Sequence, residues 1–519
     1  MVGTKSKWED ELGRWLKPFL DRLGHKARRR MCPLYISGLI GPGDRKSVQP
    51  MAARLVPGEY DQLHHFISDG VWDAAPLEAE LLIQADRLVG GKDAVLVIDD
   101  TAMPKKGDRS VGVAPQYASS LGKTANCQTL VSLTLAQGEV PVMVALRLFV
   151  PESWTSNPVR LKRAGVPVEY RAARTKPEVA LAEIDRVIAS GARFGCVLAD
   201  SGYGSSGPFR QALSERGLLW AVGLSRRQNV YPADIALIFP IAKTGKPRKY
   251  HIPDQPPVSA EALLAEGKWQ RVSWRRGTKG RLTCLFTARR VRVADGHKHR
   301  MLDHRMPCMP GDEVWLVGER RSTGEQKYYV SNWPADARLQ MLAATIKARW
   351  VCEQAHQQLK EELGLDHFEG RSWTGLHRHA LMTRIAYAFL QSRRLQAAGR
   401  KKRIGGPPPQ PSMPAIRQAI LDLFARPPPL RCPHCEKLLA DAVDPKVAVL
   451  HGSAGCGGWL CEAEWHRRAG PRLTSDARLA LQAEPSRPPS HSASEAQGHE
   501  LGRLRRQLAP AWQPERLVH

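Results

Sequence analysis

The sequence predicts an α/β protein with a helical first part and a β-rich interruption of its α/β core. Apolar residues recur at helical spacing over residues 5–66, and from residue 93 they gather in short runs bounded by polar residues, as in buried strands. Residues 224–333 contain several β-type segments and no strong helical pattern. A chain of 519 residues has room for about two to four domains of this kind.

The charge balance indicates a polyanionic partner. The chain carries 77 Lys and Arg against 51 Asp and Glu, a formal net charge of +26, which makes nucleic acid the leading candidate. The alternative is an arginine-rich composition that follows from a GC-rich genome. No run approaches about eighteen consecutive apolar residues, and the N-terminus lacks the apolar stretch of a signal peptide, so we expect a cytoplasmic protein.

Residues 1–90 are predicted to form a helical N-terminal domain. Apolar residues such as Trp8 and Leu12 recur at helical spacing, and a second amphipathic stretch is interrupted at 57–58 by Pro-Gly. The basic run at 27–30 is compatible with DNA binding, but no helix-turn-helix pattern stands out. A DNA-binding domain and a dimerisation or packing domain therefore both remain open.

Residues 91–223 are predicted to form the first part of an α/β core. The expected order of elements is β-β-β-α-β-α-β, which is the order of the ribonuclease-H-like core. In that core one acid lies on the first strand and another at the end of the fourth, and here Asp99 and Asp200 each follow an apolar run. The expected elements, in chain order, are strands 94–98, 129–135 and 140–149, helix 177–191, strand 196–199, helix 209–215 and strand 218–222.

The rest of the core is expected after a long interruption. Residues 224–333 are predicted to be a β-rich insertion, and residues 334–397 the second part of the core. Residues 334–363 have the pattern of one long helix, and an apolar helix at 376–390 is expected to pack against it.

Three carboxylates are candidates for a metal site. Glu353 lies four residues after Arg349, and Lys360 seven after Glu353, so the three share one stripe of the long helix. If the fold brings Asp99 and Asp200 beside Glu353, the oxygen ligands preferred by Mg²⁺ or Mn²⁺ converge. The alternatives are that the stripe is a solvated face and that each aspartate is a turn residue or a helix cap.

Residues 398–519 are predicted to comprise a proline-rich linker, a cysteine cluster and a disordered tail. The linker holds a basic run at 400–403 and a short helix at 414–424. Four cysteines are spaced as C-x₂-C and C-x₄-C, an imperfect match to a zinc ribbon, so Zn²⁺ binding and an incidental extension are alternatives. The four are Cys432, Cys435, Cys456 and Cys461.

Six motifs are spread over most of residues 30–395. They are I-D-D-T at 98–101, K-K-G-D-R-S-V-G-V-A-P-Q-Y at 105–117, G-K-T-A-N-C-Q at 122–128, A-D-S-G-Y-G at 199–204, Y-Y-V-S-N at 328–332 and D-H-F-E-G-R-S-W at 366–373. Together, though not singly, they are specific. With them the chain resembles the DDE transposases of bacterial insertion sequences, in the group that carries a β-strand insertion between the second Asp and the Glu.

The resemblance implies roles for the candidate residues. Asp99, Asp200 and Glu353 match the catalytic acids of the family, which would hold two Mg²⁺ or Mn²⁺ ions. Arg349 and Lys360 match residues that would neutralise phosphates beside the scissile bond, the arginine through its planar fork and the lysine as a point charge.

One position departs from the family pattern. The tyrosine that precedes the arginine in the family is Ile346 here, so its phosphate contact is either missing or supplied by another residue such as Tyr328 or Tyr329. His377 and His379 are expected to be polar packing residues or phosphate contacts, and not metal ligands.

Further contacts with DNA are expected around this site. Lys105, Lys106 and Arg109 are predicted to contact the DNA backbone, with solvated loop charges as the alternative. Trp315 and Trp333 are candidates for stacking on an unpaired base, although buried packing is the stronger interpretation.

The resemblance implies a cut-and-paste transposase of the bacterial cytoplasm, associated with the nucleoid. Such an enzyme would act as a homo-oligomer on double-stranded DNA, cleaving at the terminal inverted repeats and joining the 3′-OH to target DNA. Two alternatives are considered: a catalytically inactive DNA-binding remnant of a transposase, and another ribonuclease-H-like nuclease such as a junction resolvase.

Overall fold

A computed structural model describes residues 7–239, 251–277, 280–296, 308–399 and 411–425. By their contacts, the described residues up to Phe424 form one compact unit. The predicted cysteine cluster, the basic run 400–403 and the predicted disordered tail lie outside the described residues. The division of the chain into five domains stays a prediction.

The predicted helices of the first part are present. Their apolar stripes turn inward, so that Trp8, Leu12, Leu16 and Phe19 are buried on one face of the first helix. The break expected at Pro57–Gly58 separates the third helix from the fourth. The five helices are α1 (Lys7–Asp21), α2 (Lys26–Ile40), α3 (Val48–Leu55), α4 (Tyr60–Ser68) and α5 (Ala75–Val89).

A large mixed sheet forms the centre of the α/β part. Five of its strands stand in the order β4-β3-β1-β5-β6, in which β3 is antiparallel to both β1 and β4, and β5 is parallel to both β1 and β6. A further short strand, β2, pairs with β3 and was not predicted. These strands are β1 (Val95–Pro104), β2 (Ala114–Ala118), β3 (Lys123–Gln137), β4 (Val140–Leu148), β5 (Cys196–Ala199) and β6 (Trp220–Leu224).

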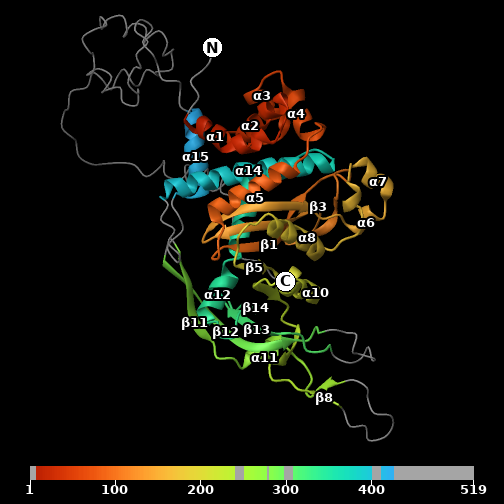
Figure 1. Cartoon of the computed structure of the whole chain (residues 1–519), viewed down its shortest axis with the longest axis vertical. Helices are drawn as coiled ribbons and strands as arrows, with labels where there is room; N and C mark the ends of the chain where they lie inside the picture. Colours follow the sequence, from red (N-terminus) through yellow and green to blue (C-terminus); the bar gives the residue numbers. More distant parts are fainter. Residues whose placement is uncertain (1–6, 240–250, 278–279, 297–307, 400–410, 426–519) are drawn as a thin grey trace, which may run out of the picture. The chain divides into compact units, whose positions relative to one another are not determined.

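The strands of residues 224–333 continue the same sheet. β14 pairs with β6 in antiparallel fashion, and β13, β12 and β7 follow in turn, with β11 beside β12. Figure 1 shows them in green beyond the core strands. The elements are β7 (Asn229–Pro232), β10 (Val258–Ser259), β11 (Gln270–Gly277), β12 (Gly280–Val293), β13 (Glu313–Arg320), β14 (Gln326–Ser331), the separate pair β8 (Leu237–Ile238) and β9 (Ile252–Pro253), and the unpredicted short helix α11 (Ala260–Ala265).

The first core strand is longer than predicted. It was expected to end at Ile98, but β1 continues to Pro104 because its antiparallel pairing with β3 extends to Cys127. The parallel pairing of β1 with β5 does end at Ile98, opposite Ala199. Asp99 therefore lies inside a strand, one residue beyond the end of the parallel pairing.

The helices between the strands follow their sequence signals. α8 (Lys176–Ala189) begins with a capping box in which Thr175 and Glu178 bond each other's backbone amides, and Pro177 occupies its first turn. α10 (Gly207–Glu215) matches its prediction. The short helices α6 (Glu152–Thr155), α7 (Pro158–Arg163) and α9 (Ser201–Gly204) were not predicted.

The long helix predicted at 334–363 is two helices, α12 (Leu339–Lys347) and α13 (Trp350–Glu361). The hydrogen bonds tighten at the break, where the amide of Arg349 bonds Ile346 O, three residues back, at 3.4 Å. Leu342 and Ile346 of α12 pack with residues of β11, β12 and β13, and Val351 and Cys352 from the first turn of α13 join the same cluster. Further along α13, Ala355 and Leu359 pack in the larger cluster.

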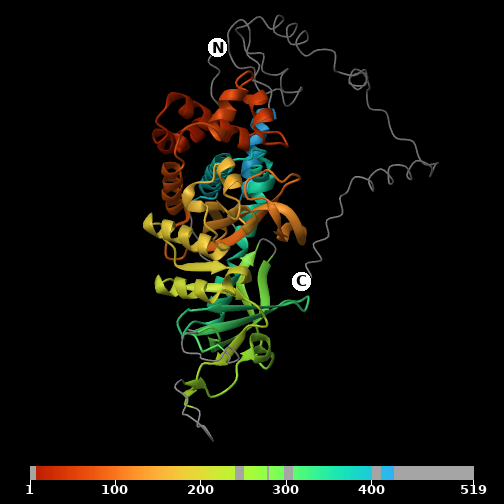
Figure 2. The same ribbon diagram turned by 90° about the vertical axis from the view of Figure 1, so that its right-hand side faces the viewer.

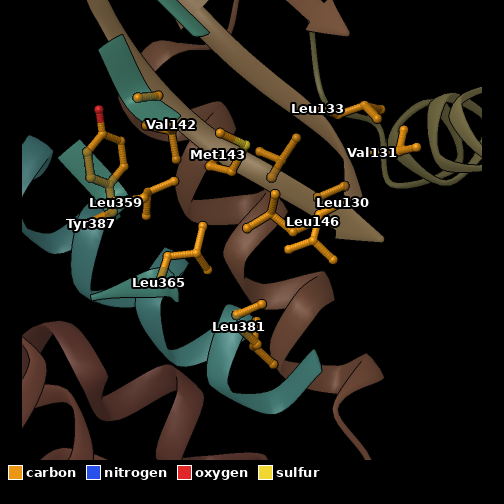
Figure 3. Packing of buried hydrophobic residues seen from close by; sticks show 14 of the residues in the cluster. Leu130, Val131, Leu133, Val142, Met143, Leu146, Leu359, Leu365, Leu381 and Tyr387 are labelled. Carbon is orange, nitrogen blue, oxygen red and sulfur yellow. The ribbon is translucent and has the colours of Figure 1, made fainter. Parts of the chain in front are cut away.

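α14 (Trp373–Ala397) is almost wholly buried and lies between the N-terminal helices and the sheet, as Figures 1 and 2 both show. Figure 3 shows Leu381 and Tyr387 of this helix, together with Leu359 and Leu365, facing apolar residues of β3 and β4. The last described helix, α15 (Met413–Ala425), packs Met413 and Ile420 into the same cluster. No helix within the described residues combines the length and the apolar character needed to span a membrane.

Candidate active site

Asp99, within β1, and Asp200, directly after the end of β5, lie side by side. Continuing the parallel register of β1 and β5 by one residue past Ile98 and Ala199 places the two aspartates opposite each other. Asp200 also caps α9, where its Oδ1 accepts from the amides of Gly202 at 3.0 Å and Tyr203 at 3.3 Å. The predicted alternative of a helix cap is thus a real role of Asp200, and one that fixes its carboxylate beside Asp99.

The pKa values of both acids are raised above their ordinary values. Burial, and then the neighbouring charge of Asp99, raise the pKa of Asp200 to about 6. Burial also raises the pKa of Asp99, against the opposing effect of Arg349. A buried carboxylate whose pKa is raised by a neighbouring carboxylate marks a place where a cation is favourable.

Arg349 links the first acid to Glu353. Its Nη1 donates to Asp99 Oδ2 at 2.6 Å, and its Nη2 donates to Glu353 Oε1. Burial alone would lower the pKa of Arg349, but Asp99 and Glu353 raise it overall. Glu353, in the first turn of α13, keeps 59% of its side chain exposed. Arg349 thus joins two of the three predicted acids, and Asp200 lies beside one of them, Asp99.

The donor set fits a hard divalent cation, since all its members are carboxylate oxygens and two of them are buried and close together. Within the part of the chain that the structure describes, no three His, Cys, Asp or Glu side chains are grouped to hold a metal ion. Arg349 contacts Asp99 and Glu353 instead. The metal assignment therefore stays a prediction.

Ser132 and His356, which the sequence did not single out, form a hydrogen-bonded pair at the backbone of Asp99. Ser132 Oγ donates to the carbonyl of Asp99 at 3.0 Å and lies 2.8 Å from Nε2 of His356. Because the serine hydroxyl has one proton and gives it to the carbonyl, Nε2 of His356 must be the donor. Burial lowers the pKa of His356 to about 4, so the ring is neutral at pH 7.

The thiol of Cys352 is a second missed contact, 3.1 Å from Asp99 Oδ2. The only sequence signal for either contact is spacing. Cys352 directly precedes Glu353, and His356 follows it by three residues, which places both on the side of α13 that faces β1. Their partners are distant in sequence: Asp99 of β1 lies 253 residues before Cys352, and Ser132 of β3 lies 224 residues before His356.

Two predicted DNA-contacting lysines have partners inside the protein. Lys360 donates to Ala102 O at 2.8 Å, and Lys105 donates to Phe368 O at 2.8 Å. Burial lowers the pKa of both lysines. Lys106 and Arg109 are exposed on the same loop as Lys105. Contact of these residues with DNA stays a prediction.

The aromatic residues near the site are packed. Trp315 donates from Nε1 to Pro334 O at 2.9 Å, and it lies with Trp333 at the edge of a buried cluster, in line with the packing interpretation. Ile346 is buried in this cluster. The hydroxyl of Tyr329, which was considered as a substitute for the family tyrosine, donates to Glu319 Oε2 at 2.8 Å.

His377 and His379 are buried polar packing residues, as expected. His379 contacts the Tyr35 hydroxyl at 2.8 Å and Gly364 O at 3.1 Å, while His377 Nδ1 lies 2.9 Å from Trp373 O. Burial lowers the pKa of His377 to about 3 and that of His379 to about 4.

Comparison with known proteins places the chain in a family. The sequence profile described as DDE superfamily endonuclease matches residues 18–281, a range that includes Asp99 and Asp200 and ends before Glu353. A relative described as a probable transposase for insertion sequence element IS701, from Microchaete diplosiphon, is 31% identical over 231 residues. That match covers 43% of this chain and 55% of the relative, so the chain spans about half the length of the relative.

A solved structure is similar at a low level. The cryo-EM structure of the piggyBac transposase synaptic complex with hairpin DNA is 10% identical, with 82% of this chain and 80% of that chain covered, at a TM-score of 0.35. A likeness with this score carries no argument about the fold or the activity.

Proposed function

Because the chain belongs to the DDE superfamily endonucleases, we propose that it is an insertion-sequence transposase that cleaves the ends of its element and joins the 3′-OH to target DNA. The membership confirms the family predicted from the sequence. The observation that carries the proposal is the placement of Asp99 beside Asp200, with Arg349 joining Asp99 to Glu353.

The sheet order supports a ribonuclease-H-like core. The strands β4-β3-β1-β5-β6, with the first three antiparallel and the last two parallel to β1, follow the order expected for that core. Under this proposal β7 to β14 are the insertion between the second acid and the third. Their pairing with β6 through β14 makes them an extension of the catalytic sheet.

Asp99, Asp200 and Glu353 would hold two Mg²⁺ or Mn²⁺ ions. When bound, such ions supply a nucleophile at neutral pH and stabilise the leaving oxygen of a phosphodiester. The chain contributes the geometry: Ser132 and Cys352 fix the carbonyl and the carboxylate of Asp99, and the α9 amides fix Asp200.

Arg349 and Lys360 would bind phosphate groups of the DNA. Arg349 offers a planar donor fork, and in exchanging its carboxylate partners for a phosphate it would leave those carboxylates to the cations. Lys360 would add a positive charge at the same helix face, near Ala102. The partners proposed are double-stranded DNA, as terminal repeats and as target, and further copies of this chain, in a bacterial cytoplasm.

The test is cleavage of a linear duplex that carries the inverted repeat found beside the gene, with and without Mg²⁺. We expect Mg²⁺-dependent cuts at the repeat boundary. Cuts that ignore the repeat and follow branched structures would favour another ribonuclease-H-like nuclease. Tight binding to the repeat without any cut would favour an inactive DNA-binding remnant.

A further inference from the structure

The two-stranded ribbon of β11 and β12 carries an unbalanced positive charge. From Gln270 to Val293 the sequence holds seven arginines and one lysine, and no aspartate or glutamate. Figure 1 shows β11 and β12 side by side at one end of the sheet.

Three of these arginines serve the fold. Arg290 pairs with Glu313 at 2.7 Å, Arg275 pairs with Glu139, and Arg292 donates to Gly311 O at 2.7 Å. These contacts tie the ribbon to its neighbours, and so they do not explain the remaining charge.

The other four described arginines are exposed on the same side of the ribbon and form no ion pair with any described residue. On that side Thr287, between Arg281 and Arg289, is buried near Leu264 of α11. Arg276 and Arg281 are directly opposite each other in the register, and Arg271 is opposite Leu285. Arg289 follows Leu285 by four residues on the same strand and so points to the same side. The four, named here the ribbon arginines, are Arg271, Arg276, Arg281 and Arg289.

This arrangement costs free energy unless an anion is present. Like charges directly opposite each other on a strand pair repel, as at Arg276 and Arg281. The nearby acids of β13 are already paired, Glu313 with Arg290 and Glu319 with Lys347. A polyanion is therefore the natural counter-charge for this face.

The dimensions and the position fit duplex DNA. With about 3.3 Å per residue, the eight steps from Arg281 to Arg289 span about 26 Å, and a two-stranded ribbon has the width of a DNA groove. The opposite face of the ribbon packs on α12, and Arg275 lies 4.4 Å from the ring of Trp350 at the start of α13. DNA held on the ribbon is thus fixed relative to the helix that carries Glu353.

We propose that the ribbon arginines bind the phosphate backbone of the DNA substrate, as a contact surface separate from the candidate active site. The proposal rests on the proposed function, because it names a second surface for the same substrate. Backbone contacts of this kind give affinity and position without reading sequence.

The test compares wild type with a variant in which all four ribbon arginines are changed to Gln. Binding to a linear duplex of random sequence is measured by fluorescence anisotropy in EDTA, at KCl concentrations from about 50 to 200 mM. The slope of log affinity against log salt should shrink by about 3.6, or 0.9 for each lost contact. A matched control variant loses the same net charge at four cations that already have ion-pair partners: Lys17, Arg193, Arg216 and Arg226, each changed to Gln.

The outcomes separate this inference from the proposed function. A smaller slope in the ribbon variant alone, with a melting temperature no lower than that of wild type, supports the inference. A wild-type slope in the ribbon variant overturns it, and so does an equal loss in the control, which would reflect net charge only. If wild type binds the random duplex but does not cut its repeat, that result counts against the proposed function. The comparison of salt slopes still tests whether the ribbon arginines bind DNA.

Discussion

The pair formed by Ser132 and His356 gives a prediction that can be worked out from the structure. Ser132→Ala removes the hydrogen bond to the carbonyl of Asp99 and leaves the Nε2 proton of the buried His356 without its acceptor. A lost hydrogen bond costs about 0.5–1.5 kcal/mol, and a buried donor left unpaired costs about 1–3 kcal/mol. The free energy of unfolding should therefore fall by about 1.5–4.5 kcal/mol.

A double-mutant cycle isolates the contact. His356→Leu removes the donor while keeping an apolar side chain of similar size, so adding Ser132→Ala in that background should cost much less than in wild type. We expect a coupling energy of about 1–3 kcal/mol. The assay is urea-induced unfolding followed by the fluorescence of the fourteen tryptophans. Strictly additive effects, within about 0.5 kcal/mol, would refute the claim that this pair stabilises the strand of Asp99.

Three further predictions concern charge. Asp200→Asn should raise the free energy of unfolding at pH 8 by up to about 3 kcal/mol, because the pKa of Asp200 is raised from 3.8 to about 6 and its ionised form is destabilising above that pH. Melting temperatures measured over a range of pH check this expectation. Mg²⁺ should raise the melting temperature of wild type more than that of the variant. The free energy of unfolding should fall as the pH drops below about 6.5, by about 1.4 kcal/mol per pH unit for each of His377 and His379. The pKa values of these histidines are lowered to about 3 and about 4 in the folded protein, so only the unfolded chain binds the proton in this range. In a His379→Gln variant the free energy of unfolding should depend less steeply on pH. Lys360→Ala should weaken DNA binding and lower the slope of log affinity against log salt by about 1. It should also lower the melting temperature, because the hydrogen bond to Ala102 O is lost. A lower melting temperature with an unchanged slope would mean that the lysine stabilises the fold and does not contact DNA.

The regular elements could be predicted where local signals agree. For α8, Pro177 and the apolar spacing after it were sufficient, and the Thr175 and Glu178 capping box completes the start of the helix. β5 was predicted to the residue because Cys196–Ala199 is a short apolar run with polar ends. The continuation of β1 through Asp99 could not be read from the sequence, because it depends on pairing with a distant strand and not on an apolar run.

The break in the predicted long helix was not visible in the sequence. Neither Gly nor Pro occurs from Leu339 to Glu361, so the local sequence favours one helix. Residues on both sides of the break, Ile346 and Val351, pack in the same cluster, so the break does not mark a change of apolar pattern.

The acids of the candidate site could be predicted from the sequence, whereas the residues that hydrogen-bond to them could not. Asp99 and Asp200 were expected to meet because each follows a core strand, and the register of β1 and β5 places them side by side. The contact of Arg349 with both Asp99 and Glu353 was not expected, because the arginine was assigned to DNA phosphates. Ser132 gave no signal at all, since serine on a strand has many uses.

The most direct test of the central claim is the Mg²⁺-dependent cleavage of a duplex carrying the repeat beside the gene, with wild type, Glu353→Gln and a matched Glu361→Gln control on the same helix. Glu361 is exposed and bonds only to Gln357 among the described residues. We predict cuts at the repeat boundary by wild type and by the control, and none by Glu353→Gln, which should still bind the duplex. Cleavage by Glu353→Gln at the wild-type rate would contradict the assignment of Glu353 as the third acid.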